Sequence, residues 1–153
     1  MYSKQEAAQL KQAFWTSFGQ YMRPVLSTEG MRINWINYRT GEKDVAFRMD
    51  ADNRQATIAI ELGHKDQGIR QLYWEQLLQL RSTLEAALGE AWTWTEHVKD
   101  PQGRSLSRVH TEKEDVGIFK KEDWPALISF FKPRIIALDE WWSQARYAFE
   151  SLR

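Results

Sequence analysis

The residues with the clearest chemical potential lie in the stretch Ile60 to Asp66, which reads IELGHKD. An acid ends an apolar run, and a histidine, a lysine and an aspartate follow it. If the chain before this stretch forms a hairpin with a two-residue turn, Asp44 and Glu61 are diagonal neighbours on one face, roughly 7 Å apart. Two-metal nucleases hold Mg²⁺ with carboxylates placed in this way. The pattern therefore raises the hypothesis of a divalent-metal-dependent nuclease or phosphoesterase.

The lysine of such a site does not stand where the chemistry needs it. Nucleases of the PD-(D/E)XK fold carry a lysine two residues after the glutamate, and here that position is Gly63. Lys65 would share a strand face with Glu61, because side chains alternate along a strand. It lies four residues after Glu61, however, in a predicted loop. Catalysis by Asp44, Glu61 and Lys65 with Mg²⁺ is therefore kept as the alternative hypothesis. Outside it, we expect no cofactor and no bound metal.

The interpretation that we favour for this stretch is structural. Glu61 lies on the polar face of its strand, where Arg48 is its other diagonal neighbour and a natural ion-pair partner. Asp66 precedes a helical pattern and belongs to a residue type that caps helix N-termini. His64 and Lys65 are then exposed loop residues.

A third interpretation is a non-catalytic anion site. His64, Lys65 and Arg70 lie near the N-terminus of the predicted helix, where free N–H groups and the helix dipole favour a phosphate. Together with Arg48 on the adjoining strand face, they are the candidate binding residues.

The elements that must position these residues follow from periodicity and cap signals. Ser3 and Glu6 form a capping box ahead of a helical repeat. In chain order we expect a helix over 4–22, strands over 32–38, 45–51 and 56–62, a helix over 66–88, strands over 91–99 and 104–112, and a helix from about 122 to 149. The sequence thus predicts an α+β fold with the order α-β-β-β-α-β-β-α, one domain over residues 1–153. Its five-stranded, mainly antiparallel sheet is expected to carry helices mainly on one face.

The last predicted helix has apolar residues spaced alternately four and three apart, a coiled-coil-like period. The series is Trp124, Ile128, Phe131, Ile135, Leu138, Trp142, Ala145 and Phe149. Either this helix lies along the domain's own sheet and helices, or its far half pairs with a second copy of the chain. In the second case the interface residues are Trp141, Trp142 and Phe149, and the protein is a homo-oligomer.

Charge and composition narrow the functions further. Twenty-one basic residues balance 21 acidic ones, so the formal net charge is zero. A domain that binds nucleic acid mainly through its phosphates usually has a basic surplus, so a nucleic-acid partner would need a local patch. The candidates for that patch are Arg39, Lys43, Arg48, Arg54, Lys65 and Arg70.

The absence of cysteine excludes disulfides, thiol catalysis and cysteine-based metal sites. It also fits a reducing compartment. His97 and His110, on the second predicted hairpin, are expected to be solvated strand residues rather than metal ligands. The N-terminal residues do not have the pattern of a signal peptide, and no apolar run is long enough to cross a membrane. We therefore expect a cytoplasmic protein with no membrane partner.

Four segments carry a resemblance to a known family: FWTSFGQYM, INWINYRTGEKDVAFRMDADNRQATIAIELGHKD, LGEAWTW and EDWPALISFFKPRIIALDEWW. Together they resemble the family called domain of unknown function 4268, over nearly the whole chain. The resemblance implies an uncharacterised bacterial domain that occurs alone or as the C-terminal part of proteins whose other part resembles a nuclease. It also implies an association with DNA-processing or defence systems, with the catalytic carboxylates on that other part. It assigns no catalytic residue to this chain.

The leading hypothesis is therefore a non-enzymatic binding or interaction module, self-associating through its aromatic residues and last helix. Its expected partners are a second copy of the chain and a nucleic acid or a DNA-processing protein. We expect a ligand groove between the polar face of the sheet and the loops around Gly30 and Gly63 to Asp66. The alternative remains the metal-dependent nuclease at Asp44 and Glu61.

Overall fold

The computed structural model describes residues 3–153, and its sheet is built from two hairpins. β1 (Val45–Ala51) pairs antiparallel with β2 (Gln55–Leu62), and β3 (Thr93–Lys99) pairs antiparallel with β4 (Ser105–Glu114). β2 and β4 are also antiparallel neighbours, which gives the strand order β1-β2-β4-β3. The α+β class is confirmed, but the described residues form four strands rather than the expected five.

The first hairpin has the predicted register. Ala46 lies opposite Glu61, and the N–H of Gly63 donates to the carbonyl of Asp44 at 2.8 Å. In the turn, the carboxylate of Asp52 accepts from the two amides of Arg54 and Gln55, which an aspartate can do without any distant partner. Register and turn therefore follow from local sequence.

The prediction of a strand over residues 32–38 is wrong. The side-chain oxygen of Asn34 accepts from the N–H groups of Ile36 and Asn37, both at 3.1 Å, and bends the backbone into a turn. The indole of Trp35 is buried and donates to the carbonyl of Val25 at 2.9 Å. A local side-chain hydrogen bond thus outcompetes the strand propensity of this segment, and it packs as a loop.

The helices follow the cap signals closely. α1 (Lys4–Met22) begins as predicted, with the N–H of Glu6 donating to the Ser3 hydroxyl at 3.1 Å. The single helix expected over 66–88 is two helices, α2 (Gln67–Gln79) and α3 (Arg81–Leu88), which meet at a break at Leu80. Gly89 ends α3 with a φ of 71°, in the left-handed region that glycine adopts without strain.

The last helix lies along its own domain. A short 3₁₀ turn, η1 (Lys121–Asp123), leads into α4 (Trp124–Ala145), and a second one, η2 (Arg146–Leu152), follows it. Of the predicted apolar series, the buried members are Phe131, Ile135, Leu138, Trp142, Ala145 and Phe149. The long apolar stripe is therefore the core-facing side of α4 and η2.

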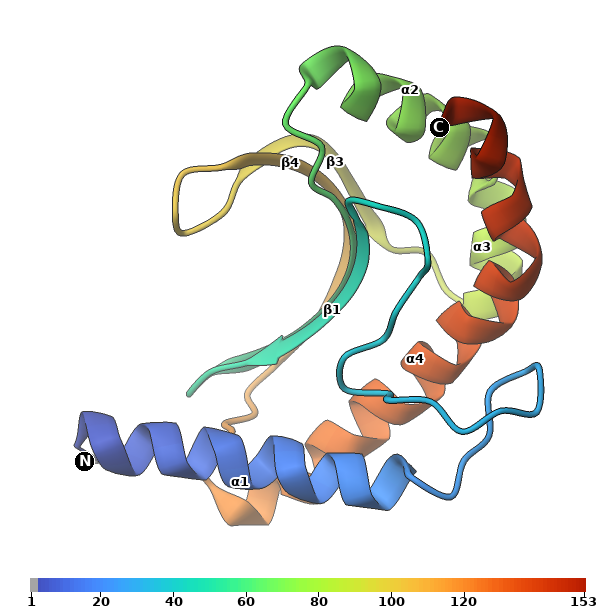
Figure 1. The fold of residues 1–153 in the computed structure, drawn as a ribbon. Coiled ribbons are helices and arrows are strands. Elements are labelled where there is room, and N and C mark those ends of the chain that lie inside the picture. The colour runs from blue at the N-terminus through green and yellow to red at the C-terminus, as the bar shows by residue number, and fades with distance from the viewer. Residues whose placement is uncertain (1–2) are drawn as a thin grey trace.

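Figure 1 shows a strongly bent sheet with its helices wrapped around the convex side. α4 runs along the convex side of the sheet. α2 and α3 lie at the upper end of the view, and α1 lies at the lower end. Phe47, Ile60 and Val109 are in register across β1, β2 and β4 and point into this core. The segment between α1 and β1 passes between the sheet and α4 (Figure 1), which sets up the candidate site. In the described part of the chain, no helix is both long enough and apolar enough to cross a membrane.

Candidate functional site

A cavity of about 590 Å³ lies between the loop 27–40 and the C-terminal end of α4. The loop contributes Ser27, Glu29, Met31, Ile33, Asn34, Asn37, Tyr38, Arg39 and Thr40, and the helix end contributes Asp139, Trp142, Ser143 and Arg146. This volume is typical of small-molecule sites, which span roughly 300–1,000 Å³. The segment that was expected to be a strand is thus one wall of a cavity.

One buried carboxylate fixes that wall to the helix. Asp139, only 5% exposed, accepts from the Tyr38 hydroxyl at 2.5 Å and from the N–H of Thr28 at 2.8 Å. Burial, together with the hydrogen bond to Asp139, raises the pKa of Tyr38 far above its usual value, so the phenol stays protonated and donates. The loop is therefore held on α4 at two points by a single side chain.

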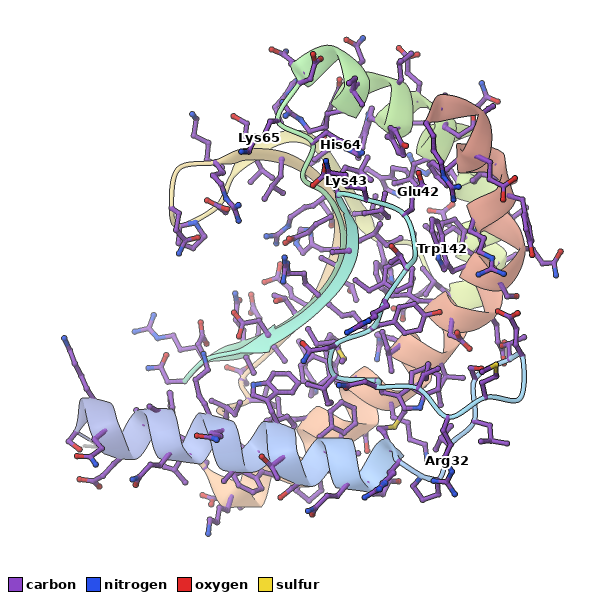
Figure 2. The ribbon with its side chains drawn as sticks, viewed as in Figure 1. Arg32, Glu42, Lys43, His64, Lys65 and Trp142 are labelled. Atoms are coloured by element: carbon purple, nitrogen blue, oxygen red, sulfur yellow. The ribbon has the colours of Figure 1, made fainter. Side chains whose placement is uncertain are left out.

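The floor of the cavity is held by hydrogen bonds and packing within the domain. The Trp142 indole donates to the carbonyl of Thr40 at 2.7 Å, and its ring packs edge-on against Phe47 at 5.8 Å between centroids. The hydroxyl of Thr40 in turn donates to the carbonyl of Val45 at 2.7 Å. Figure 2 shows Trp142 pointing from α4 toward the loop. A site with fixed walls loses little entropy when a ligand binds.

Two guanidinium groups line the cavity, one from each wall. Arg39 comes from the loop, is exposed, and forms no ion pair with any residue from 3 to 153. Arg146 is the first residue of η2; its Nη2 donates to the Tyr147 hydroxyl at 3.1 Å and lies 3.8 Å from a carboxylate oxygen of Glu29. The Nε of Arg146 is buried and has no hydrogen-bond acceptor among the described residues.

A second cavity, of about 640 Å³, lies near the β1–β2 turn and has a mostly polar lining. There the N–H of Val116 donates to the carbonyl of Arg54 at 3.2 Å, and the N–H of Gly117 donates to Asp123 at 2.9 Å. These are contacts within the chain that hold the segment after β4 against the turn. The lining of the first cavity includes the apolar side chains of Met31, Ile33 and Trp142, whereas that of the second is almost wholly polar, so the first is the better candidate for a ligand site.

A buried polar cluster lies where β1 begins and β2 ends. Glu42, 6% exposed, accepts from the Tyr73 hydroxyl at 2.8 Å and pairs with Arg153 at 3.0 Å. Burial and the hydrogen bond to Glu42 raise the pKa of Tyr73 to about 12. Figure 2 shows Glu42, Lys43 and His64 close together at this end of the sheet.

His64 belongs to the same cluster. The expectation that His64 is an exposed loop residue is wrong, because its side chain is buried, with only 6% exposed. Its ring packs on the ring of Tyr73 at 4.1 Å between centroids. Neither ring nitrogen has a hydrogen-bond partner among the described residues. Burial lowers the pKa of His64; Arg70 adds to this effect, whereas Asp44 and Glu42 oppose it. Burial therefore favours the neutral form of His64 in the folded protein.

A family model described as a domain of unknown function matches residues 10–146. The chain belongs to the DUF4268 family. No curated protein and no solved structure gave a match.

The three nuclease candidates differ in their surroundings in the DUF4268 domain. Glu61 accepts from Arg48 at 3.0 Å, which confirms the predicted ion pair. Asp44 has a φ of 64°, so its backbone leaves the strand conformation that would align it with Glu61, and its charge acts on His64. Lys65 is exposed in the loop after β2. In the part of the chain that the structure describes, no three His, Cys, Asp or Glu side chains are grouped to hold a metal ion.

The predicted anion-binding residues are partly used by contacts within the chain. Arg70 is buried and donates to the carbonyl of His64 at 2.6 Å. Asp66 accepts from the N–H of Ile69 at 3.0 Å, so the N-terminus of α2 already holds a carboxylate, as the cap prediction stated. Within the predicted basic patch, Arg54 lies at the opposite end of the β1–β2 hairpin from Lys43.

The expected interface residues lie inside the domain. Trp141 is 6% exposed, Trp142 2% and Phe149 1%. All three pack in the core of their own chain, so they offer no free surface to a second copy. Trp142 nevertheless belongs to the candidate site, as the floor of the cavity.

Sequence reasoning missed the cavity's polar groups, Tyr38, Asp139 and Arg146. Asp139 did leave a signal, because it is an acid inside the apolar run IIALDEWW, directly after the core residue Leu138. A charged residue at such a position is buried only when it is paired. That argument predicts a partner but cannot name Tyr38, which lies 101 residues away.

Proposed function

We propose that this domain is a non-catalytic binding module, whose ligand is a small molecule held in the cavity between the loop 27–40 and α4. The cavity of about 590 Å³ is the observation that carries this proposal. Its lining combines the apolar side chains of Met31, Ile33 and Trp142 with polar and charged groups from both walls. The Asp139 carboxylate and the Trp142 indole hold its two walls in place.

Substitution of a lining residue tests the proposal. Ser143 lines the cavity, and Ser129 lies earlier on the same helix, outside the cavity lining, so Ser143→Trp fills the site and Ser129→Trp is the matched control. The probe is a panel of small organic acids, amines and neutral aromatic compounds, followed by ligand-detected NMR. Compounds that bind the wild type and Ser129→Trp but not Ser143→Trp support the proposal. If no compound shows this difference, the cavity is not a binding site.

We further propose that the module serves as an accessory to DNA-processing or defence systems in the cytoplasm. The family resemblance is the support for this part. A nuclease or methyltransferase encoded beside this gene is the expected finding. Neighbouring genes of unrelated metabolism would contradict it.

A further inference from the structure

Arg146 lines the cavity, and its guanidinium keeps a donor that the described residues do not use. Its Nη2 is engaged by Tyr147, whereas its Nε is buried without an acceptor in residues 3–153. A guanidinium presents its N–H groups as a planar fork that matches the two oxygens of a carboxylate or phosphate. An oxyanion on the Nε side would satisfy a donor that the protein itself leaves unpaired.

The protein already places a carboxylate beside this fork. Glu29 lies 3.8 Å from Nη2 of Arg146, at the long end of the ion-pair range, and its side chain is 57% exposed. Such exposed pairs contribute little free energy. A ligand oxyanion that contacts the fork directly can therefore displace Glu29, which makes Glu29 a competitor for the same guanidinium.

The other charges of the cavity are compatible with an anion. Both oxygens of Asp139 are occupied by hydrogen bonds from Tyr38 and Thr28, and its side chain is buried. Arg39 adds a second guanidinium from the opposing loop, with no ion pair to residues 3–153 to neutralise it. An anionic group thus meets two cations and two carboxylates, of which Asp139 is buried and hydrogen-bonded within the protein and Glu29 is weakly held.

We propose that the ligand of this cavity is a small organic oxyanion, with its carboxylate or phosphate bound by Arg146 and Arg39. This inference rests on the proposed function. The organic part of the ligand lies against Met31, Ile33 and Trp142, which supply the apolar lining. Glu29 weakens binding by competing for Arg146.

Equilibrium disulfide capture tests this assignment, because the chain has no cysteine of its own. Ser143→Cys places the sole thiol in the cavity, and Ser129→Cys places it on α4 outside the cavity lining. The probes are matched aromatic disulfide fragments that differ only in carrying a carboxylate, a phosphonate or a primary amide. Intact-mass spectrometry under a reductant series gives the strength of capture.

We expect the Ser143→Cys protein to prefer at least one acid over its amide by about tenfold, as a charge-assisted hydrogen bond provides. Ser129→Cys should show no such preference. In the Ser143→Cys protein, Arg146→Gln or Arg39→Gln should remove most of the preference, and Glu29→Gln should increase it. Arg32→Gln is the matched charge control, since Arg32 lies on the same loop but outside the cavity lining (Figure 2). Arg146→Lys keeps the positive charge but loses the planar pair of N–H donors, so it should also lower the preference for acids over amides.

The outcomes separate the two proposals. Equal capture of acids and amides by Ser143→Cys, above the level at Ser129→Cys, overturns the oxyanion assignment and leaves the binding site standing. Capture no stronger than at Ser129→Cys overturns both. A preference that survives Arg146→Gln and Arg39→Gln also refutes the assignment. The ratio of carboxylate to phosphonate capture identifies which oxyanion the site takes.

Discussion

The loop that forms the cavity wall is fixed to α4 through one carboxylate, Asp139. It accepts one hydrogen bond from Tyr38 and one from the N–H of Thr28 while it is 5% exposed. Hydrogen bonds to charged groups contribute about 1.5–3 kcal/mol each. Tyr38→Phe removes one of them and should lower the free energy of unfolding by about 1.5–3 kcal/mol. Asp139→Ala removes both and should cost about 3–6 kcal/mol on the same scale.

Two measurements check these values. Urea unfolding followed by tryptophan fluorescence gives the free energies of the single variants and of the double variant Tyr38→Phe/Asp139→Ala. Because the two side chains share one hydrogen bond, the double variant should be more stable than the sum of the single losses predicts, by more than about 0.5 kcal/mol. Hydrogen exchange should show faster exchange of the Thr28 amide in Asp139→Ala but not in Tyr38→Phe.

The reasoning fails if the single losses are additive. It also fails if the Thr28 amide remains protected in Asp139→Ala. Ser143→Ala is a suitable control, because it changes a half-buried cavity residue without touching this carboxylate. Its unfolding free energy should change much less than that of Tyr38→Phe.

Three further predictions follow from the rest of the molecule. Burial lowers the pKa of His64, so its contribution to stability is present above the unfolded pKa of about 6.5 and is lost as pH falls through the folded pKa. His64→Phe should therefore reduce the loss of unfolding free energy between about pH 7.5 and 5.5, whereas substitution of the exposed His97 by Phe should not. Ser3→Ala should cost about 1 kcal/mol in chemical denaturation, because the first turn of α1 loses its cap. The alternative hypothesis predicts Mg²⁺-dependent cleavage of DNA or RNA that Glu61→Ala abolishes; cleavage that persists in this variant would contradict it.

Local signals were enough to predict much of the fold. The Ser3 and Asp66 caps, the β1–β2 register and the Arg48–Glu61 pair all involve residues that are close in sequence or joined by a short turn. Such contacts follow from the side-chain period of each element and from the length of the turn. For the same reason the boundaries of α1 and β1 were predicted correctly.

The site could not be predicted in the same way, because its contacts are distant in sequence. Tyr38 meets Asp139 across 101 residues, and Glu42 meets Arg153 across 111. Periodicity says only that a residue faces inward, not which other inward residue it meets. The misassigned strand shows a second limit, since one side chain, Asn34, redirected a segment of strong strand propensity.

The cavity's two walls have a consequence for how a ligand can be found. One wall comes from the loop 27–40 and the other from the end of α4, so unfolding separates them and destroys the site. A compound that binds only the folded chain raises its unfolding free energy by RT ln(1 + [L]/Kd), about 2.7 kcal/mol at a hundredfold excess over Kd. Thermal unfolding is thus itself an assay for the ligand, and it requires no assumption about the cellular role of the domain.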